Sequence, residues 1–391
     1  MNRKRLGDIV NFKRGYDLPE RSRKLGPYPI ISSSGISGYH NEFKRDGEGL
    51  ITGRYGTLGQ YFYVKGKYWP LNTALYATDF KGNYPKYVYF LLKSLGHQKT
   101  SDKSAVPGVN RNDLHEILIP YIEPDKQKPI ADFLFQIEEK IELNNKINDE
   151  LEAMAQAIYD YWFVQFDFPD ENGKPYKSSG GKMVWNEKIK QKIPTGWKNG
   201  TLSDLGKIVG GSTPSKECSV NFSRNGIAWI TPKDLSINAG KKFITKGEID
   251  ISEVGYQAAS LKIMPRGTVL LSSRAPIGYM AIARSPVTTN QGFKSFVPQS
   301  GFTSQYIYYT VKNAIPIIIN HSSGSTFKEV SGGVLKDISV CLPPVDCISK
   351  FTDFVDAIFE KQDKVELENE TLTELRDWLL PMLMNGQINV K

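Results

Sequence analysis

The chain contains two tandem copies of one sequence pattern, and this repeat constrains the fold more than any single motif does. Asp132, in the run IADFLFQIEEKIE, corresponds to Asp353, in FTDFVDAIFEKQDK, 221 residues further along the chain. Upstream of these runs the offset becomes smaller, as insertions would cause. The other matching pairs are Glu139 and Glu360, Leu151 and Leu372, Ile158 and Leu379, Leu114 and Leu335, Ile117 and Ile338, Tyr87 and Tyr306, Tyr89 and Tyr308, Arg54 and Arg274, and Leu6 and Leu202. The repeat therefore predicts two similar domains within the 391 residues.

Each copy has the same order of parts, a globular part followed by a long helix. Short β-like runs in the globular parts predict strands at residues 50–52 and 60–64, and again at 269–272 and 279–283. The first helix is expected to begin after Pro129 and the second near Ser349. The segment between the copies is rich in turn-forming residues and is expected to be a loop. The predicted boundaries are a first globular domain at 1–123, a first helix at 124–164, a connector at 165–196, a second globular domain at 197–343 and a second helix at 344–391.

Both predicted helices carry an apolar stripe with alternating spacings of four and three residues. The stripes run from Ile130 to Trp162 and from Phe351 to Leu383. A 3.5-residue period kept over four heptads favours a helix pair, and a lone helix packed on its own domain is the alternative. We predict antiparallel helices, because a parallel pair would crowd two basic domains together. Asn148 and Asn369 lie at equivalent stripe positions and are expected to meet near the middle of the pair, where they would set its register.

Charge alternates along the chain in blocks that follow the repeat. The net charge is +8 over residues 1–123, −5 over 124–164, +3 over 165–200, +7 over 201–343 and −5 over 344–391. Basic domains attract a polyanion, whereas acidic helices are repelled by one and suit a protein partner. Ordinary solvated surface would explain one such block, but two matched cycles favour a functional division.

Several classes of protein are disfavoured by what the sequence lacks. No apolar run approaches the roughly 20 residues of a membrane span, and a basic N-terminus without an apolar core is not a signal peptide, so a cytoplasmic protein without membrane contact is expected. Three cysteines and four scattered histidines do not have the spacing of a metal site. Nucleotide-binding GxxxxGK[ST] and GxGxxG motifs, HExxH, and the Asn/Asp-Pro-Pro-aromatic motif of amino-methyltransferases are missing as well. The chain is therefore predicted to have no catalytic centre, no metal and no cofactor of its own.

The duplicated domain with a long acidic helix after each copy resembles the specificity subunit of type I restriction–modification systems. The resemblance covers the whole chain and is clearest in the second copy. Its strings there are Trp197 to Leu202, Gly210-Gly211-Ser212-Thr213-Pro214, Ile227 to Asp234, Asn290-Gln291-Gly292 and Leu342-Pro343-Pro344. The first copy is more divergent and has Arg14-Gly15-Tyr16-Asp17-Leu18-Pro19 where the second has GGSTP.

The resemblance implies a fold and a set of partners. It implies an α+β architecture in which two globular mixed α/β target recognition domains are separated by two long antiparallel coiled-coil helices, with an internal pseudo-two-fold repeat. Each domain would read one half of a split double-stranded DNA sequence. Two methyltransferase subunits, which carry S-adenosylmethionine, would dock on the helices, and restriction or translocase subunits, which use ATP and Mg²⁺, would join them.

Residues expected to touch DNA are those that can reach base edges or neutralise phosphates. Arg54 and Arg274 are expected at equivalent places in Gly-containing hairpin-like turns and could meet guanine or phosphate, while Asn72, Asn290 and Gln291 carry the amides suited to adenine. Each could instead serve its own turn. The remaining candidates are Arg14, Tyr16, Lys103 and Arg111 in the first domain and Thr213, Lys216, Thr231, Lys233 and Lys328 in the second, with phosphate contact the expected role of the lysines.

Two other functions stay open at the level of sequence. A coiled-coil adaptor whose basic domains bind proteins would show no salt-sensitive affinity for DNA, whereas a DNA-binding protein would lose affinity steeply between ~50 and ~200 mM salt. A DNA-modifying enzyme acting alone would transfer a methyl group from S-adenosylmethionine to DNA without a partner.

Overall fold

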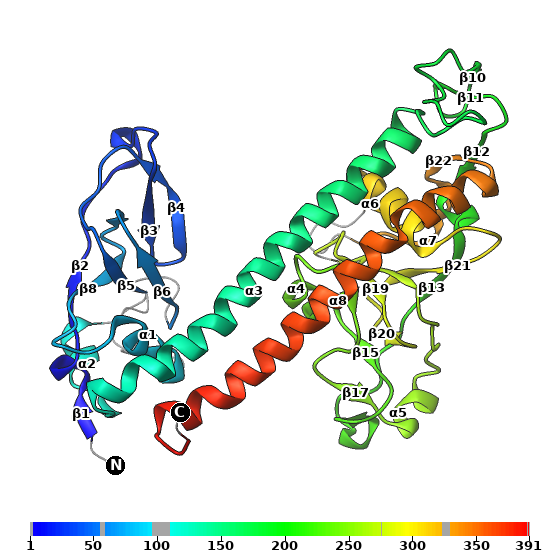
Figure 1. The fold of residues 1–391 in the computed structure, drawn as a ribbon. Coiled ribbons are helices and arrows are strands. Elements are labelled where there is room, and N and C mark those ends of the chain that lie inside the picture. The colour runs from blue at the N-terminus through cyan, green and yellow to red at the C-terminus, as the bar shows by residue number, and fades with distance from the viewer. Residues whose placement is uncertain are drawn as a thin grey trace. The chain divides into compact units, whose positions relative to one another are not determined.

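The structure, a computed structural model, describes residues 3–54, 59–95, 110–274, 276–322, 329–388 and 390. The chain divides into two compact units, one formed by Met1–Leu143 with Asn369–Lys391 and the other by Asn144–Glu368. Each unit contains one globular domain and a part of each of two long helices (Figure 1).

In the part that the structure describes, the first globular domain has three small sheets and two short α-helices. In the first sheet the strand order is β2 (Asn11–Arg14), β8 (Ala74–Asp79), β5 (Glu48–Gly53) and β6 (Tyr61–Lys65), all antiparallel. In the second, β3 (Tyr28–Ser32) pairs antiparallel with β4 (Gly35–His40) and parallel with β7 (Trp69–Pro70). The outer elements are α1 (Pro85–Ser94), α2 (Arg111–His115) and the antiparallel pair β1 (Arg3–Arg5) and β9 (Leu118–Pro120). The core of this unit also includes Leu380, Leu383 and Met384 from the last long helix.

The second globular domain repeats this topology with additions. Its main sheet has the order β13 (Gly206–Gly210), β21 (Lys294–Pro298), β18 (Val269–Leu271), β19 (Met280–Ala283) and β16 (Phe243–Ile244). The parallel pair is β15 (Trp229–Ile230) with β20 (Thr288–Thr289), and the terminal pair is β12 (Lys198–Thr201) with β22 (Ser339–Leu342). Its helices are α4 (Pro232–Ile237), α5 (Glu253–Ala258), α6 (Ser304–Asn320) and α7 (Gly332–Asp337), and β14 (Phe222–Ser223) pairs with β17 (Asp250–Ile251).

The two domains agree in individual hydrogen bonds as well as in strand order. The amide of Leu6 donates to the carbonyl of Ile117 at 2.9 Å, and the amide of Leu202 donates to the carbonyl of Ile338 at 3.0 Å. These are pairs that the sequence repeat matches. The predicted internal repeat is therefore confirmed by the backbone.

The same bonding corrects one predicted equivalence. The amide of Arg54 bonds to the carbonyl of Thr73, the residue before Ala74, and in the second domain it is the amide of Ser273 that bonds to the carbonyl of Gly292. The counterpart of Arg54 is therefore Ser273, and the match with Arg274 is wrong by one residue. Because successive strand residues face opposite sides, this shift changes the surface on which each arginine lies.

The long helices are α3 (Pro124–Tyr159), which continues as a π-helical turn at Asp160–Val164, and α8 (Val345–Met384). Helix α3 begins at Pro124, earlier than the expected start after Pro129. Proline suits the first helical turn because the amides there have no partner within the helix, and Pro129 removes only one further bond. Among the described helices, none combines the length and the hydropathy that a membrane span requires.

Contacts between α3 and α8 show that the helices run antiparallel in each unit. In the first unit Arg376 lies 3.6 Å from Glu138, and the Asn369 side chain donates to the carbonyl of Ile141. In the second unit, further along α3, the partners lie earlier in α8, since Asn144 donates to Glu368 at 2.8 Å and Gln362 donates to the carbonyl of Asn148. The predicted antiparallel pairing is confirmed.

Asn148 and Asn369 belong to different compact units, and the contact predicted between them stays a prediction. The Asn148 side chain donates to the carbonyl of Gly240 at 3.2 Å, and Asn369 contacts Ile141. Both asparagines are buried, but the register places each of them beside a different residue of the opposite helix, Asn148 beside Gln362 and Asn369 beside Ile141.

The connector contains regular structure that the sequence did not predict. Strands β10 (Met183–Asn186) and β11 (Gln191–Pro194) form an antiparallel hairpin. The turn between them is closed by a 2.9 Å bond from the Lys190 amide to the Asn186 carbonyl, with Lys190 at φ 57°. The connector is rich in turn-forming residues, which predict a loop, and the short strands between them are too brief to give a clear alternating pattern.

Candidate nucleic-acid interface

The second domain has a groove of about 530 Å³ that contains most of its predicted contact residues. Trp229 and Phe222 contribute apolar surface, and Ile249 lies at the edge. The predicted residues that line this groove are Thr213, Lys216, Thr231, Lys233, Asn290 and Gln291. These residues come from three segments of the sequence, at 213–216, 231–233 and 290–291, and the fold brings them together.

Helix α4 fixes one side of the groove. Thr231 is its N-cap, and the Thr231 hydroxyl and amide both bond to the carboxylate of Asp234, at 2.6 and 2.8 Å. Asp234 also accepts the amide of Glu248 at 2.8 Å, which holds the facing loop against the helix. Thr231 therefore stabilises the groove through its capping bonds.

Lys233 stands at the mouth of the groove beside a carboxylate. Its ammonium lies 2.5 Å from Glu248, and this hydrogen bond raises the pKa of Lys233. Both side chains are largely exposed, at 67% and 61%. An exposed pair of this kind exchanges readily with other partners, so Lys233 is available to a phosphate at low cost.

The turn after β20 carries the two amides of the groove. The side-chain oxygen of Asn290 accepts the amide of Gly292 at 2.9 Å, so Asn290 shapes the turn. Gln291 is exposed, and the Thr213 hydroxyl donates to its side-chain oxygen. Of the two side-chain amides, Gln291 is therefore the one exposed to solvent, and its hydrogen bond from Thr213 fixes its orientation.

In the first domain an exposed polar cluster forms at the end of β2. Asp17 lies at its centre, with the guanidinium of Arg14 at 3.3 Å, and the Asn72 amide donates to the same carboxylate oxygen. Tyr16 points inward instead, where its hydroxyl bonds to that of Tyr76 at 3.0 Å. Asp17 was not among the predicted contact residues. Aligning RGYDLP with GGSTP places Asp17 opposite Thr213, which was predicted, so the sequence did contain a signal for it.

The polar cluster of the first domain and the groove turn of the second, here called the two polar edges, are held by one framework of equivalent backbone hydrogen bonds. The amide of Tyr16 bonds to the carbonyl of Pro70 at 2.8 Å, and the amide of Ser212 bonds to that of Thr289 at 3.0 Å. A tryptophan indole donates to the backbone carbonyl at the same place in each domain. In the first domain Trp69 donates to the carbonyl of Tyr16 at 3.5 Å, and in the second Trp229 donates to the carbonyl of Ser212 at 3.2 Å.

This framework sets the equivalence of the side chains that follow. Asp17 comes directly after Tyr16 as Thr213 does after Ser212, and Asn72 lies two residues after Pro70 as Gln291 does after Thr289. In each domain the two side chains of the pair are hydrogen-bonded to one another. The framework is shared, and the side chains that it presents differ.

The other predicted contact residues lie elsewhere. Arg111 is exposed at the first position of α2, and Arg54 is partly buried after β5. Arg274 pairs with Glu329 at 3.1 Å. Lys103 and Lys328 lie outside the described residues. No group of three or more His, Cys, Asp or Glu side chains is arranged to hold a metal ion in the part of the chain that the structure describes.

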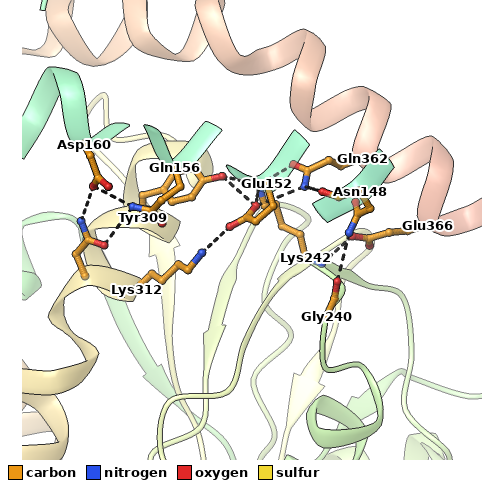
Figure 2. Close-up of polar contacts among 11 residues, drawn as sticks. Asn148, Glu152, Gln156, Asp160, Gly240, Lys242, Tyr309, Lys312, Gln362 and Glu366 are labelled. Carbon is orange, nitrogen blue, oxygen red and sulfur yellow. Dashed lines mark hydrogen bonds and ion pairs between the residues drawn. The ribbon is translucent and has the colours of Figure 1, made fainter. Parts of the chain in front are cut away.

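A buried polar network attaches the second domain to the helices, as Figure 2 shows. The Lys242 side chain is 2% exposed; its ammonium lies 2.7 Å from Glu152 on α3 and donates to Tyr309 and Gln362 at 2.7 Å each. The amides of Lys242 and Phe243 donate to Glu366 on α8 at 2.7 and 3.0 Å. Burial lowers the pKa of Lys242 to about 8 against the opposing effect of Glu152, and burial raises the pKa of Glu366 to about 7.

Acidic residues of the helices are used in the same way in both units. Arg284 lies 3.1 Å from Glu366, and Lys312 lies 2.6 Å from Glu152. In the first unit Lys93 lies 2.5 Å from Glu138. Part of the negative charge of the helices therefore holds the chain's own domains, a role that the charge pattern alone did not indicate.

Replacing Glu366 with glutamine is expected to remove a pH dependence of stability. Burial raises the pKa of this carboxyl above its unfolded value, so its stabilising effect is present below about pH 4.5 and is lost as the pH rises through about 7. Urea unfolding at pH 5 and pH 7.5 should show a smaller difference for Glu366→Gln than for the wild type. Glu360→Gln, an exposed change on the same helix, is the control, and equal differences in all three proteins would contradict the assignment.

A duplicated domain with one framework and two different polar edges defines a protein with two binding surfaces of related design. The family model described as type I restriction modification DNA specificity domain matches residues 1–153 and 194–375. The chain belongs to this family.

Individual relatives agree with this assignment. The type I restriction enzyme MjaIX specificity subunit of Methanocaldococcus jannaschii is 38% identical over 212 residues, which are 51% of this chain and 48% of that protein. The HindI specificity subunit of Haemophilus influenzae is 29% identical over 318 residues, 68% of each chain. The chain thus spans about half the length of the first relative in the aligned region. The S subunit of a type I restriction–modification system from M. genitalium shares the fold, with a TM-score of 0.63 at 16% identity over 98% of this chain and 95% of that one.

Proposed function

We propose that this chain is the DNA-recognition subunit of a type I restriction–modification complex, in which each globular domain reads one half of a bipartite double-stranded target. The observation that carries the proposal is the shared framework with different side chains, Asp17 and Asn72 in one domain and Thr213 and Gln291 in the other. Recognition of two different half-sites requires two domains of the same fold that present different side chains to the DNA. The basic charge of both domains supports the same conclusion.

Binding of the full-length chain to DNA is expected to weaken steeply with salt. A protein that neutralises six to ten phosphates loses roughly 10³- to 10⁵-fold in affinity between 50 and 200 mM salt. Titration of duplex DNA at several salt concentrations measures the slope. Lys216→Ala and Lys233→Ala should each reduce the slope by about one phosphate, without changing the preferred sequence. An affinity that does not respond to salt would favour the coiled-coil adaptor instead.

The helices are the proposed docking surfaces for two methyltransferase subunits. Each unit exposes large apolar side chains on α3 and α8, among them Trp378 in the first and Phe354 in the second, both 62% exposed. Exposed apolar side chains on a helix suit a protein partner. Co-purification should yield two methyltransferase subunits per chain, and a 1:1 complex would contradict the proposal. Restriction or translocase subunits would join this assembly.

Catalysis is assigned to the partners in this proposal. S-adenosylmethionine would be held by the methyltransferase subunits, and ATP and Mg²⁺ by the restriction subunits, in the cytoplasm. The purified chain mixed with S-adenosylmethionine and DNA is therefore expected to transfer no methyl group. Methyl transfer by the chain alone would favour the independent modifying enzyme.

A further inference from the structure

The equivalent pairs Asp17–Asn72 and Thr213–Gln291 differ in which amide atom the partner holds. Asp17 accepts a hydrogen bond from the Asn72 nitrogen, whereas Thr213 donates one to the Gln291 oxygen. The first arrangement leaves the Asn72 oxygen for an outside partner, and the second leaves the Gln291 nitrogen. The two edges therefore present groups of opposite hydrogen-bonding character at equivalent places.

We propose that Asp17 is a positioning residue that fixes the Asn72 amide so that its oxygen faces the DNA, and that the Asp17–Asn72 pair determines one base of the first half-site. The inference rests on the proposed function. An ionised carboxylate can only accept hydrogen bonds, so Asp17 binds the amide nitrogen and not the oxygen. Arg14, 3.3 Å from the same carboxylate oxygen, restrains Asp17 in turn.

An amide held in this way matches one kind of base edge. The outward oxygen of Asn72 accepts from an exocyclic amino group, which in the major groove belongs to adenine or cytosine. The second N–H of the Asn72 amide remains able to donate to N7, which makes adenine the two-bond partner. The pair thus selects adenine over guanine, whose edge presents only acceptors at these positions.

The second domain is expected to show the opposite preference at the equivalent position. With its oxygen held by the Thr213 hydroxyl, Gln291 presents two N–H donors. These match the acceptors of guanine, or the O4 atom of thymine. One framework would then read two different bases through the choice of residue 17 or 213.

The test is selection of bound duplexes from a randomised library by the full-length chain. Asp17→Asn and Asn72→Ala should each lose preference at the same single base pair of one half-site by about tenfold, within the ~1–3 kcal/mol that a bidentate base contact contributes. Thr213→Val and Gln291→Ala should do the same in the other half-site. Asp17→Glu, which keeps the carboxylate, should retain most of the preference.

A charge control separates orientation from electrostatics. Glu20→Gln removes an exposed negative charge from the same domain and should raise affinity for all sequences alike, without changing base preference. Substituting 2-aminopurine for the selected adenine, which removes the N6 amino group, should weaken wild-type binding and leave Asn72→Ala unaffected.

The outcomes distinguish the inference from the function on which it rests. If the wild type selects a bipartite target but Asp17→Asn keeps its full base preference, or shifts a position different from that of Asn72→Ala, Asp17 does not orient the amide. If the wild type selects no half-site, the proposed function fails and the inference fails with it.

Discussion

Replacing Lys242 with alanine is expected to destabilise the second unit by about 2–3 kcal/mol, because it removes a buried side chain together with its ion pair to Glu152 and its hydrogen bonds to Tyr309 and Gln362. Glu152 and Glu366 both bond to Lys242, through its ammonium and its backbone amide respectively. Burial opposes ionisation of Glu152, but Lys242 and Lys312 outweigh it and lower the pKa of Glu152. Removing Lys242 leaves Glu152 with Lys312 as its cation, and alanine keeps the backbone amide that donates to Glu366, so the loss comes from the buried ammonium and its own bonds. Urea unfolding of the full-length chain measures the loss.

A matched variant shows whether burial is the cause. Lys233→Ala breaks an ion pair with Glu248 of similar length, but both side chains are exposed, so a much smaller loss is expected. Combining Lys242→Met with Glu152→Gln should recover part of the stability, because the double variant removes both charges of the pair. Equal losses for Lys233→Ala and Lys242→Ala would show that the buried network contributes no more than a surface pair.

Inserting seven residues into both helices is expected to change the spacing of the DNA target while its half-site sequences stay the same. The insertions would follow Leu143 in α3 and Glu368 in α8, where the two compact units meet along the chain. A heptad preserves the apolar stripe and adds about 10 Å of helix, which corresponds to at most about three base pairs of spacer. Affinity for the original target should fall at least ~100-fold, because one half-site can no longer be engaged.

The control is an insertion in α3 alone. It would move Ile141 and Asn148 two turns further apart in α3 while their partners Asn369 and Gln362 keep their spacing in α8, so the helices could not keep both contacts. This variant is expected to unfold at lower urea without gaining a new target. If the wild type and the double insertion select the same spacer length, the length of the helices does not set the distance between the half-sites.

Much of the architecture could be predicted from the sequence, because it depends on patterns that repeat along the chain. The match of Leu6 with Leu202 and of Ile117 with Ile338 appears as equivalent backbone bonds. The apolar stripes predicted a helix pair, and charge repulsion predicted its antiparallel direction, which the contact of Arg376 with Glu138 bears out. Periodicity and composition are local properties, so a single sequence displays them.

Register and proximity were decided only by the tertiary structure. Arg54 aligned with Arg274 by residue type, but the hydrogen-bond ladder matches it with Ser273. Asn148 and Asn369 are equivalent in the repeat, yet each contacts a different residue. One-residue shifts are invisible in a sequence pattern, although each reverses the face on which a strand side chain lies.

The roles of individual polar side chains also required the folded chain. Lys242 stands in a polar turn of the sequence, and only the packing of that turn against α3 and α8 buries its ammonium. Asp17 and Asn72 are 55 residues apart and become partners because β2 and β8 are adjacent in one sheet. The sequence by itself determined that there are two domains of one design on a helix pair. Which side chains meet at their edges depended on long-range strand pairing, which no local pattern encodes.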